Sequence, residues 1–186
     1  MFILGSTSPR RKELLSKIVS DFKILSPQYN EECVDKTSKH YALEEAKGKA
    51  SSLIPYIKKD DCLICCDTIV FLNNKIYGKP KNKEDAFKIL KELSNNVHTV
   101  ISGYVIIYND IVLTKEVNTY VKFNELDDTL INRYIDETNP MDKAGAYAIQ
   151  EDNKYHLIQS IEGTISNVMG FPIEDIKEDL IKLGLL

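Results

Sequence analysis

The sequence predicts an α/β protein in which a mixed sheet with flanking helices forms two lobes around a central cleft. Two observations carry this prediction. Segments with helical periodicity alternate with short apolar segments typical of buried strands, and two long segments rich in β-branched residues flank a turn-like Asn-Asp pair. Alternation of helices and strands favours parallel pairing, whereas a hairpin pairs its strands antiparallel, so one sheet should contain both. No linker, repeat or low-complexity tract interrupts the chain, so residues 1–186 are expected to form a single domain.

The N-terminal part predicts a strand, a helix, a second strand and a second helix. The first strand is "FILG", and a helix follows from Pro9 to about residue 19, because Ser8 is a favoured N-cap and proline suits the first helical position. "DFKILSP" is extended again. Residues 38–53 have the pattern of a helix, although Gly48 costs it roughly 1 kcal/mol.

The middle of the chain predicts two hairpins separated by a helix. "CLICCDTIVFL" is a strand that turns at Asn73-Asn74 into a short second strand. Residues 83–94 carry apolar side chains at helical spacing. Residues 98–123 are then expected to form two long antiparallel strands joined at Asn109-Asp110.

The C-terminal third predicts a helix over "DDTLINRYIDET" and then a loop at Pro140. Strands are expected within "AGAYAIQ" and within "KYHLIQSIEG". The segment "NVMGFP" is expected to be a loop, and a closing helix spans residues 173–183.

Composition and charge exclude several classes of protein. A hydrophobic share of 43% is typical of globular proteins. The net charge of −4 and the absence of a basic block argue against a nucleic-acid or membrane-surface partner. The apolar run at the N-terminus is too short for a signal peptide, and no stretch approaches membrane-spanning length, so a cytoplasmic location is expected.

The cysteines include a formal C-x-x-C pair, Cys62 and Cys65, within "CLICC". No second pair and no histidine stands at metal-ligand spacing from it. We therefore expect buried thiols on a strand rather than a zinc or redox centre.

The stretch "GSTSPRRKELL" places two arginines, Arg10 and Arg11, in the first turn of a helix, where the helix dipole disfavours cations. Free backbone N–H groups, the hydroxyls of the preceding residues and two guanidinium groups would together bind an anion of the size of a phosphate. The alternative is a pair of solvated surface arginines after an ordinary N-cap.

Asp67 is the second candidate site residue, because it interrupts a run that should otherwise be core. A buried carboxylate is costly unless it is paired or bound to a metal, so its position indicates a functional site at a strand end. The alternative is an aspartate that caps a turn through its own backbone.

Two loops supply further candidates. Lys79 lies between a glycine and a proline, which suits a lysine directed at a phosphate and equally an ordinary turn. In "MDKAGAYAIQ" small residues permit close approach of the backbone to a ligand, and the Gln150 amide, which both donates and accepts, could recognise a base edge. The alternative is a tight loop leading into a strand.

Five motifs together closely resemble the Maf family of nucleoside triphosphate pyrophosphatases over nearly the whole chain. They are "GSTSPRRKELL", "CDTIVFLNNKIYGKP", "HTVISG", "NPMDKAGAYAIQ" and "GTISNVMGFP". The resemblance implies a two-lobed α/β fold with a deep cleft, similar to that of the inosine triphosphate pyrophosphatases. It also implies a housekeeping enzyme that hydrolyses a nucleoside triphosphate to the monophosphate and pyrophosphate with a divalent metal, Mg²⁺ or Mn²⁺.

The resemblance also implies roles for individual residues. Asp67 matches the family's proton acceptor, which would orient and activate water. Glu31, or its neighbour Glu32, matches a family acidic position, so that Glu31 and Asp67 could jointly hold the metal. The phosphate-binding set that it implies is Ser6, Arg10, Arg11, Lys49 and Lys79.

Three positions linked to base choice in the family are Arg10, Thr68 and Gln150. This combination resembles the branch that hydrolyses dTTP and UTP, whereas the branch acting on 7-methyl-GTP departs from the patterns around Arg10 and Gln150. A pyrimidine nucleotide is the expected substrate. Two alternatives stay open: another base specificity, such as 7-methyl-GTP, and a nucleotide-sensing regulator of cell division and septum formation with little turnover. A homodimer is implied by resemblance only.

Overall fold

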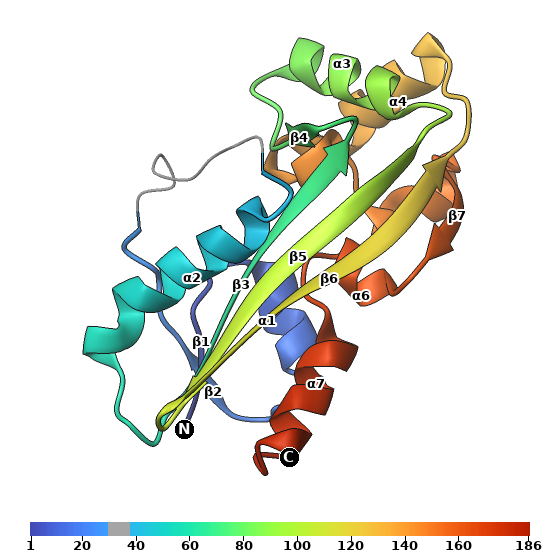
Figure 1. Cartoon of the computed structure of the whole chain (residues 1–186). Helices are drawn as coiled ribbons and strands as arrows, with labels where there is room; N and C mark the ends of the chain where they lie inside the picture. The colour runs from blue at the N-terminus through green and yellow to red at the C-terminus, as the bar shows by residue number, and fades with distance from the viewer. Residues whose placement is uncertain (30–37) are drawn as a thin grey trace.

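The computed structural model describes residues 1–29 and 38–186, which form a mixed seven-stranded sheet with helices on both faces (Figure 1). The strand order is β2-β1-β3-β5-β6-β7, with β4 paired to β3. β1 pairs in parallel with β2 and β3, and the other pairs are antiparallel. The predicted fold class is confirmed. The strands are β1 (Phe2–Leu4), β2 (Phe22–Ile24), β3 (Cys62–Leu72), β4 (Lys75–Tyr77), β5 (Val97–Tyr108), β6 (Ile111–Phe123) and β7 (Ile158–Glu162).

The helices fall close to the predicted segments. Most of them begin or end within three residues of the expected bounds, and the closing helix is one of these. The α-helices are α1 (Pro9–Leu15), α2 (Tyr41–Leu53), α3 (Lys83–Leu93), α4 (Asp128–Thr138), α5 (Asp152–Tyr155), α6 (Ile165–Val168) and α7 (Ile173–Lys182). The 3₁₀ turns are η2 (Ile54–Tyr56), η3 (Pro140–Asp142), η4 (Ala144–Ala146) and η5 (Ile149–Glu151).

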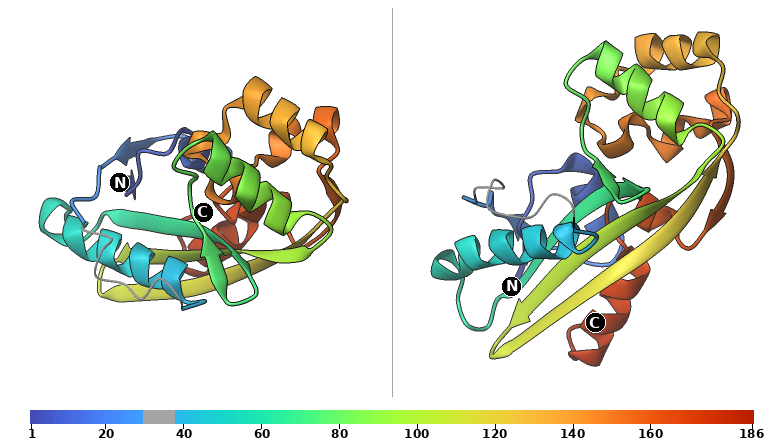
Figure 2. Two further views of the ribbon diagram at one scale, coloured as in Figure 1. Left: turned by 90° about the horizontal axis from the view of Figure 1, so that it is seen from above. Right: turned by 45° about the horizontal axis from the view of Figure 1, so that its top comes forward.

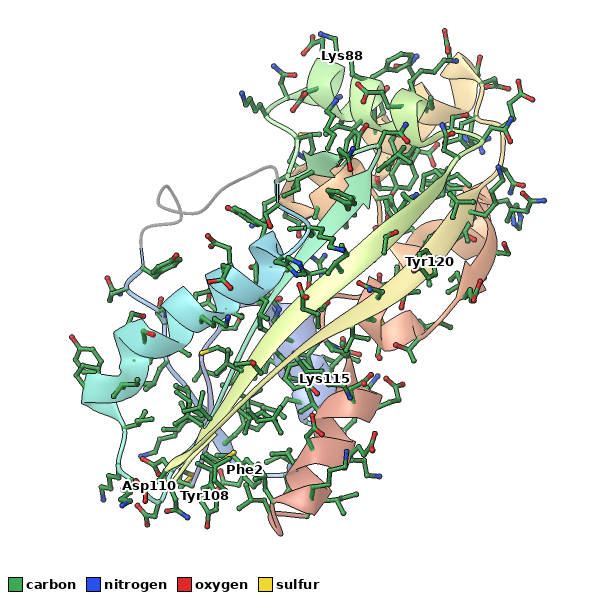
Figure 3. The ribbon with its side chains drawn as sticks, in the orientation of Figure 1. Phe2, Lys88, Tyr108, Asp110, Lys115 and Tyr120 are labelled. Atoms are coloured by element: carbon green, nitrogen blue, oxygen red, sulfur yellow. The ribbon has the colours of Figure 1, made fainter. Side chains whose placement is uncertain are left out.

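The first lobe is built where β1, β3 and β5 lie side by side. One face of this part of the sheet packs on α1 and α7 through a core that contains Leu15, Tyr104 and Leu180. The opposite face packs on α2. Phe2, Tyr108 and Asp110 lie together at the end of the sheet where the β5–β6 turn is found (Figure 3).

The second lobe lies at the other end of the long strands, where Figure 2 shows α3 and α4 gathered over them. Its core joins Val70 at the end of β3 with Leu90 of α3, Phe123 of β6 and Tyr134 of α4. The amphipathic pattern that predicted α3 reflects this contact, because Ala86, Leu90 and their neighbours on one face are buried. The two lobes thus share β3 and β5.

Asparagines close the two predicted hairpins. Asn73 and Asn74 have φ values of 50° and 59°, and Asn109 has 54°. Left-handed backbone of this kind matches the right-handed twist of the paired strands, and asparagine tolerates it better than most residues. Both turn predictions are confirmed.

The C-x-x-C pair is divided between the two faces of the sheet. Side chains alternate along a strand, so Cys62 and Cys66 face the core under α1 and α7, whereas Cys65 faces α2. Cys62 and Cys65 therefore cannot bind one metal ion together. The expectation of buried strand thiols is confirmed for these three residues.

Gly48 has a packing reason to stand in the middle of α2. A Cβ atom at this position would lie 2.1 Å from a ring carbon of Tyr29. The glycine therefore lets the Tyr29 ring lie directly on the helix, which is a packing reason to keep a residue of low helix propensity here.

Three predictions of local structure were wrong in whole or in part. The segment "NVMGFP" is not a loop throughout, because Asn167 and Val168 belong to α6. The first helix ends at Leu15 rather than near residue 19, because the Ser16 hydroxyl donates to the Glu13 carbonyl at 2.7 Å and the chain turns there. The segment "AGAYAIQ" forms 3₁₀ turns instead of a strand. Gly145 has a φ of 71°, and its N–H donates to the Gly78 carbonyl at 3.1 Å, so a contact distant in sequence replaces a strand ladder.

We expect His98 to make the fold sensitive to mild acid. Its ring is fully buried, Nε2 lies 2.8 Å from the Tyr147 hydroxyl, and burial lowers the pKa of His98 to about 4. Between this value and about 6.5 the unfolded chain binds more protons than the folded chain, so the free energy of unfolding falls as the pH falls, by on the order of 3 kcal/mol in total.

Denaturant unfolding at pH 7.5 and at pH 4.5 measures this loss. His98→Gln should lose less stability between these two pH values than the wild type does, because the titrating ring is gone. An equal loss in both proteins would assign the acid sensitivity to other groups.

The three buried thiols should resist modification in the folded protein. Burial raises the pKa of Cys62 and Cys65 to about 12 and that of Cys66 to about 11, and only the thiolate is reactive. In a Cys33→Ser variant, a thiol-reactive dye should label these cysteines only after denaturant is added. Rapid labelling of the native variant would contradict their burial.

Candidate active site

A cleft of about 930 Å³ lies between the lobes, within the size range of small-molecule sites. One wall is the loop that leads from β1 into α1, and the facing wall contains η3, η4 and the segment before Gln150. Its lining includes every predicted site residue that the structure describes: Ser6, Arg10, Arg11, Lys49, Asp67, Thr68, Lys79 and Gln150.

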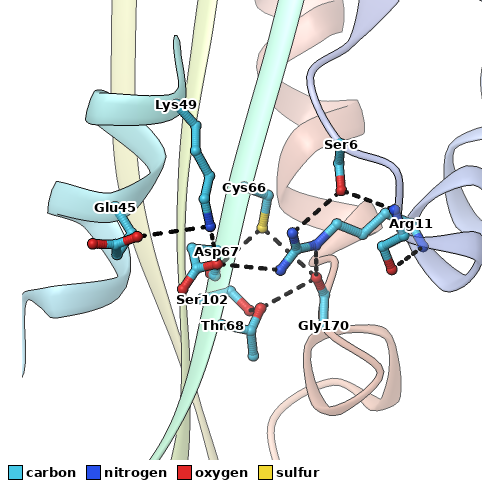
Figure 4. A network of polar contacts seen from close by, with 10 residues as sticks. Ser6, Arg11, Glu45, Lys49, Cys66, Asp67, Thr68, Ser102 and Gly170 are labelled. Carbon is cyan, nitrogen blue, oxygen red and sulfur yellow. Dashed lines mark hydrogen bonds and ion pairs between the residues drawn. The ribbon is translucent and has the colours of Figure 1, made fainter. Parts of the chain in front are cut away.

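Asp67 is paired with two cations inside this cleft (Figure 4). Lys49 Nζ lies 2.6 Å from Asp67 Oδ1, and Arg11 Nη2 lies 3.9 Å from the same oxygen. The Asp67 side chain is 18% exposed and stands within β3, so the alternative of a turn-capping aspartate is wrong. The half-buried carboxylate is instead compensated by charge, as expected for a site residue.

Helix α2 can present Lys49 to Asp67 because it approaches the sheet closely. Gly103 of β5 is the residue directly opposite Asp67. A Cβ atom at Gly103 would lie 2.3 Å from the backbone of Leu43 in α2, so any larger residue would push the helix away. The glycine of the "HTVISG" motif thus sets the distance between Lys49 and the strand.

Glu45 is a buried carboxylate behind Lys49 that the sequence analysis missed, although it does not line the cleft itself. Its side chain is 1% exposed, and its Oε2 lies 3.8 Å from Lys49 Nζ. Glu45 and Lys49 are four residues apart on one helix face, and this spacing was the available signal. Such a pair is common on solvated helices, which is why it did not stand out.

Ser6 and Arg11 are held together at the start of α1. The Ser8 side chain accepts a hydrogen bond from the Arg11 N–H at 3.5 Å, as predicted for the N-cap. Ser6 Oγ accepts from the Ser8 N–H at 3.2 Å and from Arg11 Nη1 at 3.4 Å. Arg11 therefore points into the cleft and is not a solvated surface residue.

Arg10 points away from its neighbour, toward the second lobe. Its Nη1 lies 3.7 Å from Asp142 Oδ2, and Lys143 Nζ lies 2.8 Å from Asp142 Oδ1. The Lys143 hydrogen bond lowers the pKa of Asp142 against an opposing effect of burial, and the charge of Arg10 lowers it further. The two adjacent arginines thus form ion pairs in different directions, Arg11 with Asp67 of β3 and Arg10 with Asp142 of η3.

Thr68, Lys79 and Gln150 line the cleft in different ways. The Thr68 hydroxyl lies 2.8 Å from Ser102 Oγ and donates to the Gly170 carbonyl at 3.2 Å, so it faces the protein. Lys79 and Gln150 are exposed on the cleft wall. The Gly78 carbonyl accepts from Gly145 N, which connects the loop of Lys79 to η4.

The predicted second acidic residue, Glu31, lies outside the described residues, as does Glu32. Among residues 1–29 and 38–186, no group of three or more histidine, cysteine, aspartate or glutamate side chains is arranged to hold a metal ion. In the same part of the chain, none of the helices has the length and apolar character required to span a membrane.

Comparison with known proteins agrees with this architecture. The solved structure of the Staphylococcus aureus Ham1 protein covers 98% of this chain and 98% of its own, with a TM-score of 0.55 and 13% sequence identity. At this identity the likeness concerns the fold alone.

Sequence relatives are much closer. The dTTP/UTP pyrophosphatase of Thermococcus kodakarensis is 44% identical over 176 residues, which cover 95% of this chain and 93% of that protein. The dTTP/UTP pyrophosphatase of Clostridium novyi is 44% identical over 187 residues, covering 98% and 97%. A family model described as Maf-like protein matches residues 1–183. A match over nearly the whole length, with relatives at this identity, means that the chain belongs to the family of Maf-like proteins.

Proposed function

We propose that this protein hydrolyses dTTP and UTP between the α- and β-phosphates, releasing the nucleoside monophosphate and pyrophosphate. The names of relatives that are 44% identical over nearly the whole chain support this substrate class. The observation that carries the proposal is the position of Asp67, a carboxylate flanked by Lys49 and Arg11 in a cleft large enough for a nucleotide.

The two cations beside Asp67 are placed so that they could exchange this carboxylate for the phosphate oxygens of a substrate. In the free protein Lys49 and Arg11 compensate the charge of this carboxylate. A triphosphate brings its own negative charge, so the same cations can contact phosphate oxygens and release Asp67 to accept a proton from the attacking water. Cations fixed beside the leaving pyrophosphate then stabilise the charge that develops on it.

A divalent metal fits this proposal. Mg²⁺ usually binds through one or two carboxylates together with water and substrate phosphate oxygens, and Asp67 supplies one such carboxylate on the cleft wall. Glu31 would be the second. When bound, Mg²⁺ or Mn²⁺ would neutralise charge on the phosphate oxygens.

The opposite end of the cleft is proposed to select the base. Arg10, held near Asp142, and the exposed Gln150 amide present hydrogen-bond donors and an acceptor to the cleft from its two facing walls. Thr68 would act indirectly, because its hydroxyl is engaged by Ser102 and Gly170.

The nucleoside triphosphate is the proposed small-molecule partner, and the net charge of −4 argues against nucleic acid as another. The proposal includes action in the cytoplasm, where nucleotide pools are found, and association of two chains as a homodimer.

Asp67→Asn tests the reaction. With Mg²⁺, the wild type should release dTMP or UMP together with pyrophosphate, and the variant should bind nucleotide but turn over about 10³-fold more slowly, because the proton acceptor is lost. Product release across standard and modified triphosphates, together with calorimetric binding, measures both effects.

Asp110→Asn is the matched control for this substitution. The Asp110 side chain is 82% exposed at the β5–β6 turn (Figure 3) and is not part of the cleft lining, so its loss should leave turnover unchanged. A wild type that binds nucleotide without turning over any triphosphate would refute the enzyme and favour a nucleotide-sensing regulator.

The two arginines should have separable effects. Arg11→Ala should lower kcat for every accepted nucleotide by about 10²-fold, because its charge lies at the phosphate end. Arg10→Ala should instead change the ratio of kcat/KM between dTTP and 7-methyl-GTP by about tenfold. Steady-state kinetics on both nucleotides distinguish these outcomes, and identical losses on both substrates for both variants would contradict the division of roles.

A further inference from the structure

The carbonyl of Gly170 joins the last sequence motif to the first. Gly170 O accepts a hydrogen bond from Arg11 Nε at 3.0 Å, and Arg11 is 159 positions earlier in the chain. The same oxygen accepts from Thr68 Oγ1 at 3.2 Å, and the Cys66 thiol lies 3.7 Å away (Figure 4). Three donors from two other parts of the chain therefore converge on one backbone oxygen.

This contact determines where the charge of Arg11 lies. A guanidinium group is planar and its donors have a fixed geometry, so holding Nε sets the directions of both terminal nitrogens. Nη1 then reaches Ser6 Oγ, and Nη2 faces Asp67 Oδ1. Displacement of the Gly170 carbonyl would turn these nitrogens away from the phosphate end of the cleft.

Asn167 anchors the segment that carries Gly170. Its side chain is fully buried, and Nδ2 lies 3.2 Å from the Val100 carbonyl, 3.1 Å from the Val117 carbonyl and 3.0 Å from Thr119 Oγ1. These acceptors belong to β5 and β6. The Asn167 carbonyl in turn accepts from Gly170 N at 2.9 Å, which connects the anchor to the glycine.

The amide of Asn167 is not fully satisfied. Among the described residues, its Oδ1 has no hydrogen-bond partner although it is buried. A buried amide oxygen without a partner is unfavourable for stability, and such groups call for another explanation. One such explanation is that Asn167 positions a functional group. The contacts that run from Asn167 through Gly170 to Arg11 connect it to such a group.

We propose that Asn167 is a positioning residue for Arg11. It holds residues 164–171 on β5 and β6, so that the Gly170 carbonyl directs the Arg11 guanidinium toward the substrate phosphates. The inference rests on the proposed function for the identity of the ligand. Asn167 itself does not line the cleft, whereas Gly170 does.

A double-mutant cycle tests this link. Asn167→Ala should lower kcat/KM for dTTP by about tenfold or more in the wild type, because small displacements of a catalytic group are costly. In an Arg11→Ala background the same change should lower it less than about twofold, since the group to be positioned is absent. Equal losses in both backgrounds would overturn the proposal.

Ser94→Ala is the control for lost stability. The Ser94 hydroxyl accepts from the N–H of buried Leu126 at 2.7 Å, at the end of α3 and outside the cleft lining. This variant should unfold more easily but keep its kcat/KM at a temperature where all variants are folded. A loss of activity in Ser94→Ala equal to that in Asn167→Ala would overturn the proposal, because general destabilisation would then account for both.

Affinity for dTTP without metal supplies a second readout that does not depend on turnover. If the wild type is inactive but the Asn167→Ala and Arg11→Ala variants lose affinity non-additively, the positioning role is supported and the proposed enzyme is refuted. If the wild type is active but the two variants lose both kcat/KM and affinity additively, the enzyme is supported and the positioning role is refuted.

Thr119→Val keeps the proposal testable if Asn167→Ala does not fold. It removes one acceptor of Asn167 Nδ2 together with the hydroxyl's hydrogen bonds to the Thr164 backbone, all of which hold residues 164–171 on β6, with little change of shape. It should lower kcat/KM by about threefold and only when Arg11 is present. An equal effect with and without Arg11 would count against the role of Asn167.

Discussion

The ion pair between Lys49 and Asp67 is the interaction on which the rest of the site depends. Asp67 places a charge in the middle of an otherwise apolar strand, and such a charge is tolerated only with a partner. The partner comes from α2, so this helix must lie close to the sheet. Gly103 provides the room, and Gly48 on the same helix gives room to Tyr29. The room that Gly103 leaves for α2 thus serves the half-buried carboxylate of Asp67.

The parts of the fold that sequence could predict are those decided by neighbours in the chain. The N-cap at Ser8, the left-handed asparagines at the hairpins and the periodicity of α3 are local signals, and each appears in the structure. The strand prediction for the segment "AGAYAIQ" failed for the opposite reason, because its structure depends on a residue that is not a neighbour in the chain. Its backbone pairs with Gly78, which is distant in sequence, and no local pattern contains that information.

The candidate site shows the same division between residues that a local pattern reveals and residues whose role depends on distant contacts. Asp67 was conspicuous because a charged residue stood in an apolar run, and the arginines were conspicuous at a helix start. The Gly170 carbonyl contacts Arg11, and every residue possesses a carbonyl, so no residue type in the sequence could indicate this contact. Glu45 has an ordinary helix spacing and gains its importance only from burial. Resemblance to a family supplied the position of Lys49, which pattern alone would have left among the many surface lysines, whereas Lys79 was already a candidate from its place between a glycine and a proline.

The continuity of β3 and β5 through both lobes limits how the cleft can behave. The same two strands contribute Ile64 and Ile106 to one core and Val70 and Val100 to the other. A paired ladder that runs through both cores joins the lobes more firmly than a single linker would, so we expect the cleft to keep its width when a ligand enters. Discrimination between ligands would then come from shape and from side-chain movement on this frame, with little free energy spent on closing it.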